Sequence, residues 1–231
     1  MQSLSNEQSI ISHIFSDENE VQLSLSQISH ELRNPITLIN TYLHLFASKH
    51  PEAVDCEYWH HIMSNMEFLK TLLNELSDFN HSYTLHTKMI HMTDFLKDVF
   101  QELAPLFETS NISIDYSLEP SVQMLKIDPT KLKQVLFNII RNSMEAIQTH
   151  GHISIRSSCR EHHFVLEIAD NGPGIPKDYI NNIFEPFVTY KTEGTGLGLS
   201  IAKNIIHAHN GTIHVQSKEG CGTTFVIKLP L

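Results

Sequence analysis

The sequence predicts an α+β protein built from an antiparallel helical hairpin followed by an α/β sandwich. In the first third of the chain, apolar residues recur at steps of three and four, which is typical of long helices. After residue 83, short β-type runs alternate with helical runs, and all nine glycines lie from Gly151 onward. The 231 residues are enough to bury a core without disulfide or metal staples.

Two apolar series define the hairpin. The first is Ile11, Ile14, Val21, Leu25, Ile28, Leu32, Ile36, Ile39, Leu43 and Phe46, and the second is Trp59, Ile62, Met66, Leu69, Leu73 and Leu76. The segment 48–57 between them contains Pro51, so it is expected to connect two helices. Because two helices bury little surface, we expect two chains to pair as a dimeric four-helix bundle. The alternative is a monomer whose hairpin packs on its own second part.

The second part is expected to carry strands and helices that do not alternate strictly. Strands are predicted at 89–91, 112–116, 122–127, 151–157, 164–169, 213–217 and 223–229, and helices at 93–107, about 129–148 and 198–209. Thr93 and Asp128 are the expected N-caps of the first two helices, and Asn210-Gly211 ends the third. The residues 170–196 are expected to form a polar loop. This order favours an antiparallel or mixed sheet with helices on one face.

Composition excludes several classes of protein. The formal net charge is −10, so the chain lacks the overall basic character of a nucleic-acid or anionic-membrane binder. No segment approaches the roughly 18–20 apolar residues of a membrane span. No Lys or Arg precedes Arg33, so a signal-peptide n-region is not expected. The three cysteines, Cys56, Cys159 and Cys221, are far apart, which favours a reducing compartment over a disulfide frame or zinc site.

The segment Ile28–Pro35 places a histidine beside a carboxylate on a predicted helix. If the apolar residues around it face the core, His30 and Asn34 project outward one turn apart, and Glu31 lies next to His30. A solvent-facing imidazole can act as a nucleophile when an acid polarises its other ring nitrogen. Pro35 removes an N–H and can bend the helix there. The alternative is that such an exposed histidine is simply a solvated side chain without a chemical role.

Three further patterns suit a nucleotide. Asn138 and Asn142 lie four residues apart on one helix face, and amide oxygens suit Mg²⁺. Asp170 ends an apolar strand before Gly172-Pro173-Gly174, where a carboxylate can accept an adenine amine, although a simple turn is the alternative. The segment 194–200 puts glycines before a helix, which exposes N–H groups to phosphate. It fits neither a Rossmann fingerprint nor a P-loop.

Together and in this order, the patterns resemble the catalytic core of two-component sensor histidine kinases over about residues 20–231. The matching segments are 28–35 (phosphoacceptor box), 138–146 (N box), 170–176 (first glycine box), 183–187 (F box) and 194–200 (second glycine box). The sequence Asn142–Ala146 and the short stretch from Phe187 to Gly194 are most similar to sporulation-type and nitrogen-regulator-type kinases.

The resemblance implies a domain order. It gives 1–22 as a signalling helix or linker, 23–82 as the dimerisation and histidine phosphotransfer domain, 83–87 as a hinge, and 88–231 as an ATP-binding α/β sandwich of the histidine kinase, topoisomerase II and Hsp90 type. It implies that His30 is the phosphoacceptor and that Glu31 is the general base or orienter. Asn34 would be the residue that can place water for dephosphorylating a partner.

The resemblance also implies ATP and Mg²⁺ as cofactors. Asn138 and Asn142 would hold Mg²⁺ and the phosphates, and Asp170 would bind the adenine amine. The other implied ATP contacts are Gly172, Gly174 and Ile175 at the base, Thr224 as a support of Asp170, and Lys191, Gly194, Thr195, Gly196, Leu197 and Gly198 over the phosphates in a mobile lid. Tyr190 departs from the smaller polar residue of many relatives.

The implied activity is that of a cytoplasmic, homodimeric, ATP-dependent protein-histidine kinase. It would pass its phosphoryl group to an aspartate of a response-regulator receiver domain, and phosphatase activity stays open. About 22 residues precede the hairpin, so the signal is expected from a partner protein or a missing sensor domain. The alternatives are a phosphotransferase or phosphatase that does not use ATP, a nucleotide-sensing adaptor, and a chaperone- or topoisomerase-like ATPase.

Overall fold

The computed structural model describes residues 18–108, 110–119, 124–147, 150–191 and 194–231, with the backbone alone for residues 18–28 and His30. The chain forms two compact units that divide between His81 and Ser82. The segment 83–87, expected as a hinge, therefore falls within the second unit.

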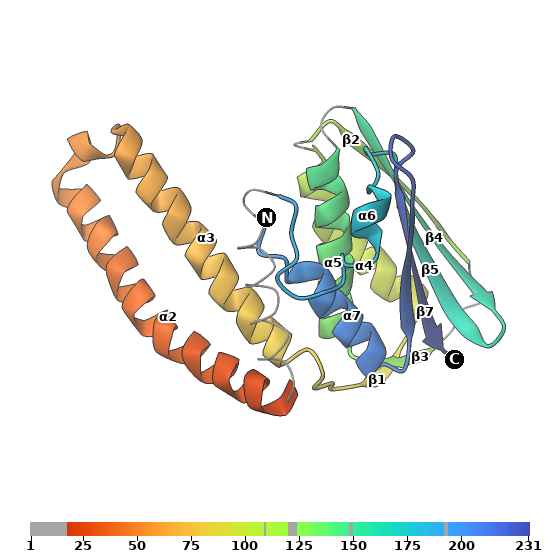
Figure 1. Cartoon of the computed structure of the whole chain (residues 1–231). Helices are drawn as coiled ribbons and strands as arrows, with labels where there is room; N and C mark the ends of the chain where they lie inside the picture. The colour runs from red at the N-terminus through yellow and green to blue at the C-terminus, as the bar shows by residue number, and fades with distance from the viewer. Residues whose placement is uncertain (1–17, 109, 120–123, 148–149, 192–193) are drawn as a thin grey trace. The chain divides into compact units, whose positions relative to one another are not determined.

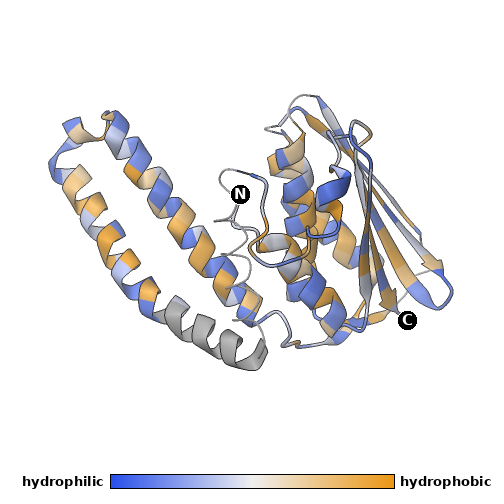
Figure 2. Cartoon of the chain, in the orientation of Figure 1, coloured by the Kyte–Doolittle hydropathy of each residue, from blue (hydrophilic) through white to orange (hydrophobic). Residues whose placement is uncertain are grey.

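The first unit is the expected helical hairpin (Figure 1). Helix α2 (Glu18–Lys49) runs antiparallel to α3 (Glu57–Asn80), and the short 3-10 helix η1 (Pro51–Ala53) lies in the connection. Helix α3 buries Trp59, Met66, Leu73 and Phe79. Apolar residues also follow α2 and α3 in Figure 2, and most of those in the described part of α2 from Leu32 to Phe46 stay exposed in the single chain.

The second unit is an α+β sandwich whose helices lie on one face of a mixed sheet (Figure 1). Its elements are β1 (Lys88–Ile90), α4 (Met92–Glu108), β2 (Ile112–Leu118), β3 (Leu125–Ile127), α5 (Pro129–Ala146), β4 (Gly151–Arg160), β5 (His163–Asp170), α6 (Lys177–Ile180), α7 (Gly198–Ala208), β6 (Thr212–Ser217) and β7 (Thr223–Pro230). The main sheet has the order β2-β4-β5-β7-β6, in which β2 and β4 are parallel and the other pairs antiparallel. Strands β1 and β3 form a separate antiparallel pair.

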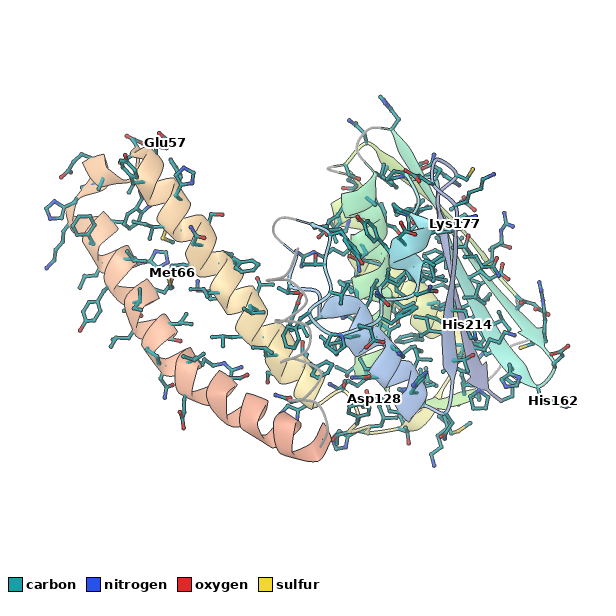
Figure 3. The ribbon with its side chains drawn as sticks, viewed as in Figure 1. Glu57, Met66, Asp128, His162, Lys177 and His214 are labelled. Carbon is teal, nitrogen blue, oxygen red and sulfur yellow. The ribbon has the colours of Figure 1, made fainter. Side chains whose placement is uncertain are left out.

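The core lies between this sheet and the helices α4, α5 and α7. Helix α5 buries Leu132, Val135, Leu136, Ile139 and Ile140, and α7 buries Ile201, Ala202, Ile205 and Ile206, all at most 1% exposed. These apolar residues repeat at three and four, so each helix has one buried face and leaves its other face for polar groups. Figure 3 labels Asp128, at the start of α5, and His162, in the turn between β4 and β5.

The structure differs from the expected elements at a few boundaries. Helix α4 begins at Met92, and Phe95 N–H donates to His91 O at 3.0 Å, so Thr93 lies inside the first turn instead of capping it. Strand β3 covers only the end of the expected 122–127, part of which lies outside the described residues. The expected loop 170–196 contains the short helix α6, which four residues in a Gly- and Pro-rich context do not signal by periodicity.

Candidate functional site

A carboxylate with a fixed orientation ends strand β5. Asp170 Oδ2 accepts a hydrogen bond from Ser143 Oγ at 2.9 Å, and Oδ1 accepts from the N–H groups of Gly172 at 2.9 Å and Thr223 at 3.3 Å. These donors come from α5, from the turn after β5 and from β7, so three separate segments hold one half-buried side chain. A carboxylate held this way can present an oxygen lone pair to an amino group without reorganising.

The glycine turn after Asp170 packs against the turn between β6 and β7. Gly220 N–H donates to Pro173 O at 2.7 Å, and Ile175 N–H donates to Ser217 Oγ at 2.8 Å. Gly174 has φ +73°, and a Cβ there would overlap the carbonyl of Lys218. Gly172 therefore contacts Asp170 directly, and Gly174 and Ile175 pack against the end of β6 and the turn after it; their contact with an adenine base stays a prediction.

The structure differs from the expectation for Thr224. Asp170 lies opposite Thr223 in the β5–β7 register, and Thr224 lies opposite Ala169. Because successive strand residues face opposite sides of a sheet, Thr224 lies on the outer face and cannot support Asp170. There it lines a hollow of about 400 Å³ with residues that include Glu167 and Lys228.

The two asparagines of α5 contact two different segments. Asn138 is half-buried, and its Nδ2 donates to Gly198 O, the first residue of α7, at 2.9 Å. Asn142 Oδ1 accepts a hydrogen bond from Lys191 Nζ at 3.0 Å. One face of α5 therefore gathers the second glycine segment and Lys191, which the sequence predicts to contact phosphates.

Lys191 also pairs with a carboxylate of α5 that the sequence reasoning did not single out. Its Nζ lies 2.6 Å from Glu145 Oε2, and Arg141 Nε lies 2.7 Å from Glu145 Oε1. Partial burial raises the pKa of Glu145, but the hydrogen bonds from Lys191 and Arg141 outweigh it and lower that pKa. Glu145 is therefore ionised at neutral pH.

The second glycine segment makes a tight turn before α7. Phe187 N–H donates to Gly196 O at 3.1 Å, and Phe187 itself has φ +64°. Gly196 has φ +72°, and a Cβ there would overlap the backbone of Phe187 and Val188. Leu197 is fully buried, and Thr195 Oγ1 accepts from its N–H at 3.3 Å.

The N-terminus of α7 leaves backbone donors available at this turn. The first helical bond runs from Ile201 N–H to Leu197 O at 2.9 Å, so the N–H groups of the preceding residues have no helical acceptor. Among the described residues, no side chain caps this end of the helix. Such a terminus stabilises an anion such as phosphate.

The residues present fit a magnesium-bound nucleotide. Asn142 Oδ1 already accepts a cation, the ammonium of Lys191, so it is placed to bind positive charge. No group of three or more His, Cys, Asp or Glu side chains forms a metal site among the described residues. Mg²⁺ usually takes one or two protein oxygens and completes its shell with phosphates and water. The site therefore suits a metal that arrives with a phosphate ligand.

The remaining predicted residues lie in the first unit. The backbone of His30 belongs to α2, and its side chain lies outside the described part of the residue. Glu31 and Asn34 are exposed on the same helix. Pro35 lies inside α2 and has no N–H to donate to the carbonyl of Glu31, which interrupts the helical bonding next to His30.

Two family descriptions match the chain, one for each unit. Residues 21–82 match the His Kinase A (phospho-acceptor) domain. Residues 127–231 match the family of histidine kinase-, DNA gyrase B- and HSP90-like ATPases. In the part of the chain that the structure describes, no helix is long and apolar enough to cross a membrane.

Curated relatives match both units together. Sporulation kinase C of Bacillus subtilis (strain 168) is 33% identical over 205 residues, which are 88% of this chain and 47% of the relative. Sensor histidine kinase ZraS of Escherichia coli (strain K12) is 31% identical over 205 residues, again 88% of this chain but 44% of the relative. The chain thus spans slightly less than half the length of these relatives.

Solved structures resemble the fold. The catalytic domain of the histidine kinase ThkA, in a nucleotide-free form, is 31% identical with a TM-score of 0.58 and covers 63% of this chain and 96% of that one. ThkA in complex with the response regulator protein TrrA is 25% identical with a TM-score of 0.67 and covers 99% of this chain and 65% of that one.

Proposed function

The chain belongs to the two-component histidine kinases, and we propose that it is an ATP-dependent kinase that phosphorylates its own His30. The phosphoryl group then passes to an aspartate of a response regulator. One observation carries this proposal: two features lie in the same unit. The carboxylate of Asp170 is fixed by hydrogen bonds, and the asparagines of α5 lie where this helix meets the glycine turn before α7. One unit thereby offers both an adenine partner and a phosphate site.

These positions support a specific set of nucleotide contacts. Asp170 accepts the adenine amine, and the backbone of Gly172, Gly174 and Ile175 lines the base, since glycines let a planar ring approach closely. Asn138 and Asn142 would hold Mg²⁺, and Lys191 with the backbone of residues 194–198 would contact the phosphates. Magnesium, when bound, neutralises the charge of the phosphates during transfer.

The phosphoryl step needs only a positioned nucleophile. A neutral ring nitrogen of His30 attacks the γ-phosphorus, so an N–P bond forms while the P–O bond to ADP breaks. Glu31 orients the imidazole and accepts the proton from its other nitrogen. In the second step the N–P bond breaks, and the phosphoryl group moves to a carboxylate oxygen of the receiver aspartate. Asn34, one helical turn after His30, would orient a water that hydrolyses the aspartyl phosphate of the response regulator, which releases inorganic phosphate.

A homodimer accounts for the apolar surface of the hairpin. Six large side chains of α2 are 45–61% exposed in the single chain, namely Leu32, Leu38, Ile39, Tyr42, Leu45 and Phe46. Exposing so much apolar surface to water is unfavourable, and covering it with a second hairpin would lower the free energy of the protein. Two hairpins then form the four-helix bundle that the sequence predicts.

The ThkA complex supports the partner assignment. In that complex the response regulator protein TrrA is bound to the kinase ThkA, and nearly the whole of this chain aligns with the kinase. We extend the same class of partner to this chain. A cytoplasmic location, where ATP and reduced cysteines are available, and an upstream sensor protein or sensor domain complete the proposal.

Incubation with γ-labelled ATP and Mg²⁺ tests the proposal. The protein should acquire an acid-labile, alkali-stable label, as expected for a phosphorus–nitrogen bond. Addition of a cognate receiver domain should transfer the label to that domain. Hydrolysis of ATP without any protein-bound label would contradict the proposal and would favour a chaperone- or topoisomerase-like ATPase.

A further inference from the structure

A lysine ammonium bridges two oxygen-bearing side chains on α5. Lys191 Nζ donates to Asn142 Oδ1 at 3.0 Å and to Glu145 Oε2 at 2.6 Å. Asn142 and Glu145 are three residues apart on one helix, so their side chains share a face. We propose, on the basis of the proposed function, that Lys191 occupies the cation position of the magnesium site when nucleotide is absent. Glu145 then adds a carboxylate to that site, beside the amides of Asn138 and Asn142.

The oxygen pair has the right chemistry for this exchange. An amide oxygen and a carboxylate oxygen are hard ligands of the kind that Mg²⁺ prefers, directly or through a bound water. The ammonium of Lys191 lies on both oxygens at once, so the pair already attracts one positive charge. When magnesium arrives with a nucleotide, the metal can replace the ammonium beside Glu145, and the phosphates can become the new partners of Lys191.

The surroundings of Glu145 make the exchange reversible. The side chains of Lys191 and Glu145 are 42% and 40% exposed, so water screens their attraction and keeps the pair weak. Arg141 Nε contacts the other oxygen of Glu145 at 2.7 Å. When Lys191 moves to the phosphates, Arg141 still orients the carboxylate. The carboxylate of Glu145 therefore has a cationic partner before and after nucleotide binding.

The test compares the affinity for a fluorescent, non-hydrolysable ATP analogue in Mg²⁺ with its affinity in EDTA. The ratio of the two affinities measures how much the metal contributes. E145Q should lower this ratio about tenfold, which is the lower end of the loss in metal affinity that is typical when a residue around a metal is replaced. K191M should raise it, because the cation that competes with Mg²⁺ for the oxygens of Asn142 and Glu145 is gone, whereas the phosphate contact of Lys191 is lost with and without the metal. E167Q, which removes the same charge from the outer face of the sheet, is the matched control and should leave the ratio unchanged.

Each outcome decides the inference. An unchanged ratio in E145Q, or equal losses of affinity with and without Mg²⁺, would overturn it and leave Glu145 as a residue that only positions Lys191. A ratio that falls in K191M would also overturn it. The ratio is expected to fall in E145Q and to rise in K191M, so either variant alone tests the inference if the other fails to fold. If the wild-type protein binds the analogue under neither condition, the proposed function itself fails, which is a distinguishable result.

Discussion

The side chain of Asp170 illustrates how single residues determine this site. Its two oxygens are held by Ser143, Gly172 and Thr223, all of which donate. A carboxylate accepts at both oxygens, whereas an amide offers one acceptor and one donor. An asparagine at position 170 could keep the contact with Ser143, because the hydroxyl of Ser143 can accept a hydrogen bond from an amide as well as donate one to a carboxylate. The carboxylate therefore matters more for the ligand than for the fold.

Asp170→Asn should lower the affinity for ATP by roughly 10- to 100-fold, since a hydrogen bond to a charged group is worth about 1.5–3 kcal/mol. Isothermal titration calorimetry with a non-hydrolysable ATP analogue measures this change. Asp115→Asn, on the exposed β2, serves as a control for the lost charge. An affinity unchanged from wild type would refute the adenine role of Asp170.

Sequence reasoning singled out Asp170 as a candidate but missed some of its supports. The turn of Asp, Gly and Pro after an apolar strand left a simple turn open, and the adenine role, which the resemblance implies, stays a prediction. Thr223 and Phe225 alternate along β7 on its inner face, so a stricter use of the two-residue period would have favoured Thr223 over Thr224. Ser143 and Glu145 gave no separate signal, because their roles depend on which segments pack against α5.

At the scale of elements, the start of α5 joins three segments. Asp128 caps the helix by accepting from Thr130 N–H at 3.0 Å and Lys131 N–H at 3.1 Å, and it accepts from His86 N–H at 2.7 Å. Its own N–H donates at 2.9 Å to His209 Nε2, beyond the end of α7. The segment 83–87, expected as a hinge, is thus anchored to the nucleotide unit at His86.

Asp128→Asn should lower the free energy of unfolding at pH 7 by about 1–2 kcal/mol, through the weakened cap. Burial raises the pKa of Asp128, but the N–H donors of His86, Lys131 and Thr130 outweigh it and lower the pKa. Because the folded pKa lies below the unfolded value, the carboxylate stabilises the fold above about pH 4 and loses this effect as the pH falls through the folded pKa.

Urea denaturation at pH 7 and at successively lower pH measures this effect. The difference between wild type and Asp128→Asn should shrink as the pH decreases. Asp98→Asn, an exposed change on α4, is the control. A difference that is constant across this range would show that the charge of Asp128 contributes nothing.

Gly196→Ala should reduce ATP affinity at least about tenfold, because the added methyl displaces the backbone of Phe187 and Val188 and with it the turn before α7. Gly220→Ala is a matched control, since Gly220 also has a positive φ, +76°, but has open space at the Cβ position. The control should lose some stability and keep its ATP affinity. Equal effects of both variants on affinity would show that the turn at Gly196 is not needed for binding.

Most elements were predictable from periodicity, and the errors have local causes. The long helices and the paired strands β4 and β5 follow clear apolar patterns with Gly or Pro at their ends. The extra residue at the start of α4 depends on the carbonyl of His91, which carries no side-chain signal. The hairpin turn at Glu161 and His162, both with positive φ, is set by the pairing of the strands.

At the scale of the whole molecule, the hairpin has apolar residues that one chain cannot cover. Ile39 in α2 is 50% exposed, and Tyr42 nearby is 61% exposed. Sequence periodicity predicted such a surface, because two helices cannot bury both of their apolar series. Association between chains is therefore a prediction that rests on the first unit alone.

Ile39→Glu should weaken self-association, because a carboxylate would be buried in an apolar interface. Analytical ultracentrifugation should give twice the mass of one chain for the wild type and a shift to single chains for the variant at the same concentration. Met89→Glu, an equally exposed apolar position at 56% in the second unit, should not change the mass. A wild-type protein that sediments as a single chain at all concentrations would contradict the dimer.

The central claim is that the nucleotide unit phosphorylates one particular histidine. The most direct test compares the labelling of wild type, His30→Gln and His44→Gln with γ-labelled ATP and Mg²⁺. His44 lies exposed on the same helix α2, so it controls for the loss of an imidazole. We expect the acid-labile label to disappear in His30→Gln and to persist in His44→Gln, and both variants to bind ATP as the wild type does. Full labelling of His30→Gln would contradict the assignment of His30 as the phosphoacceptor.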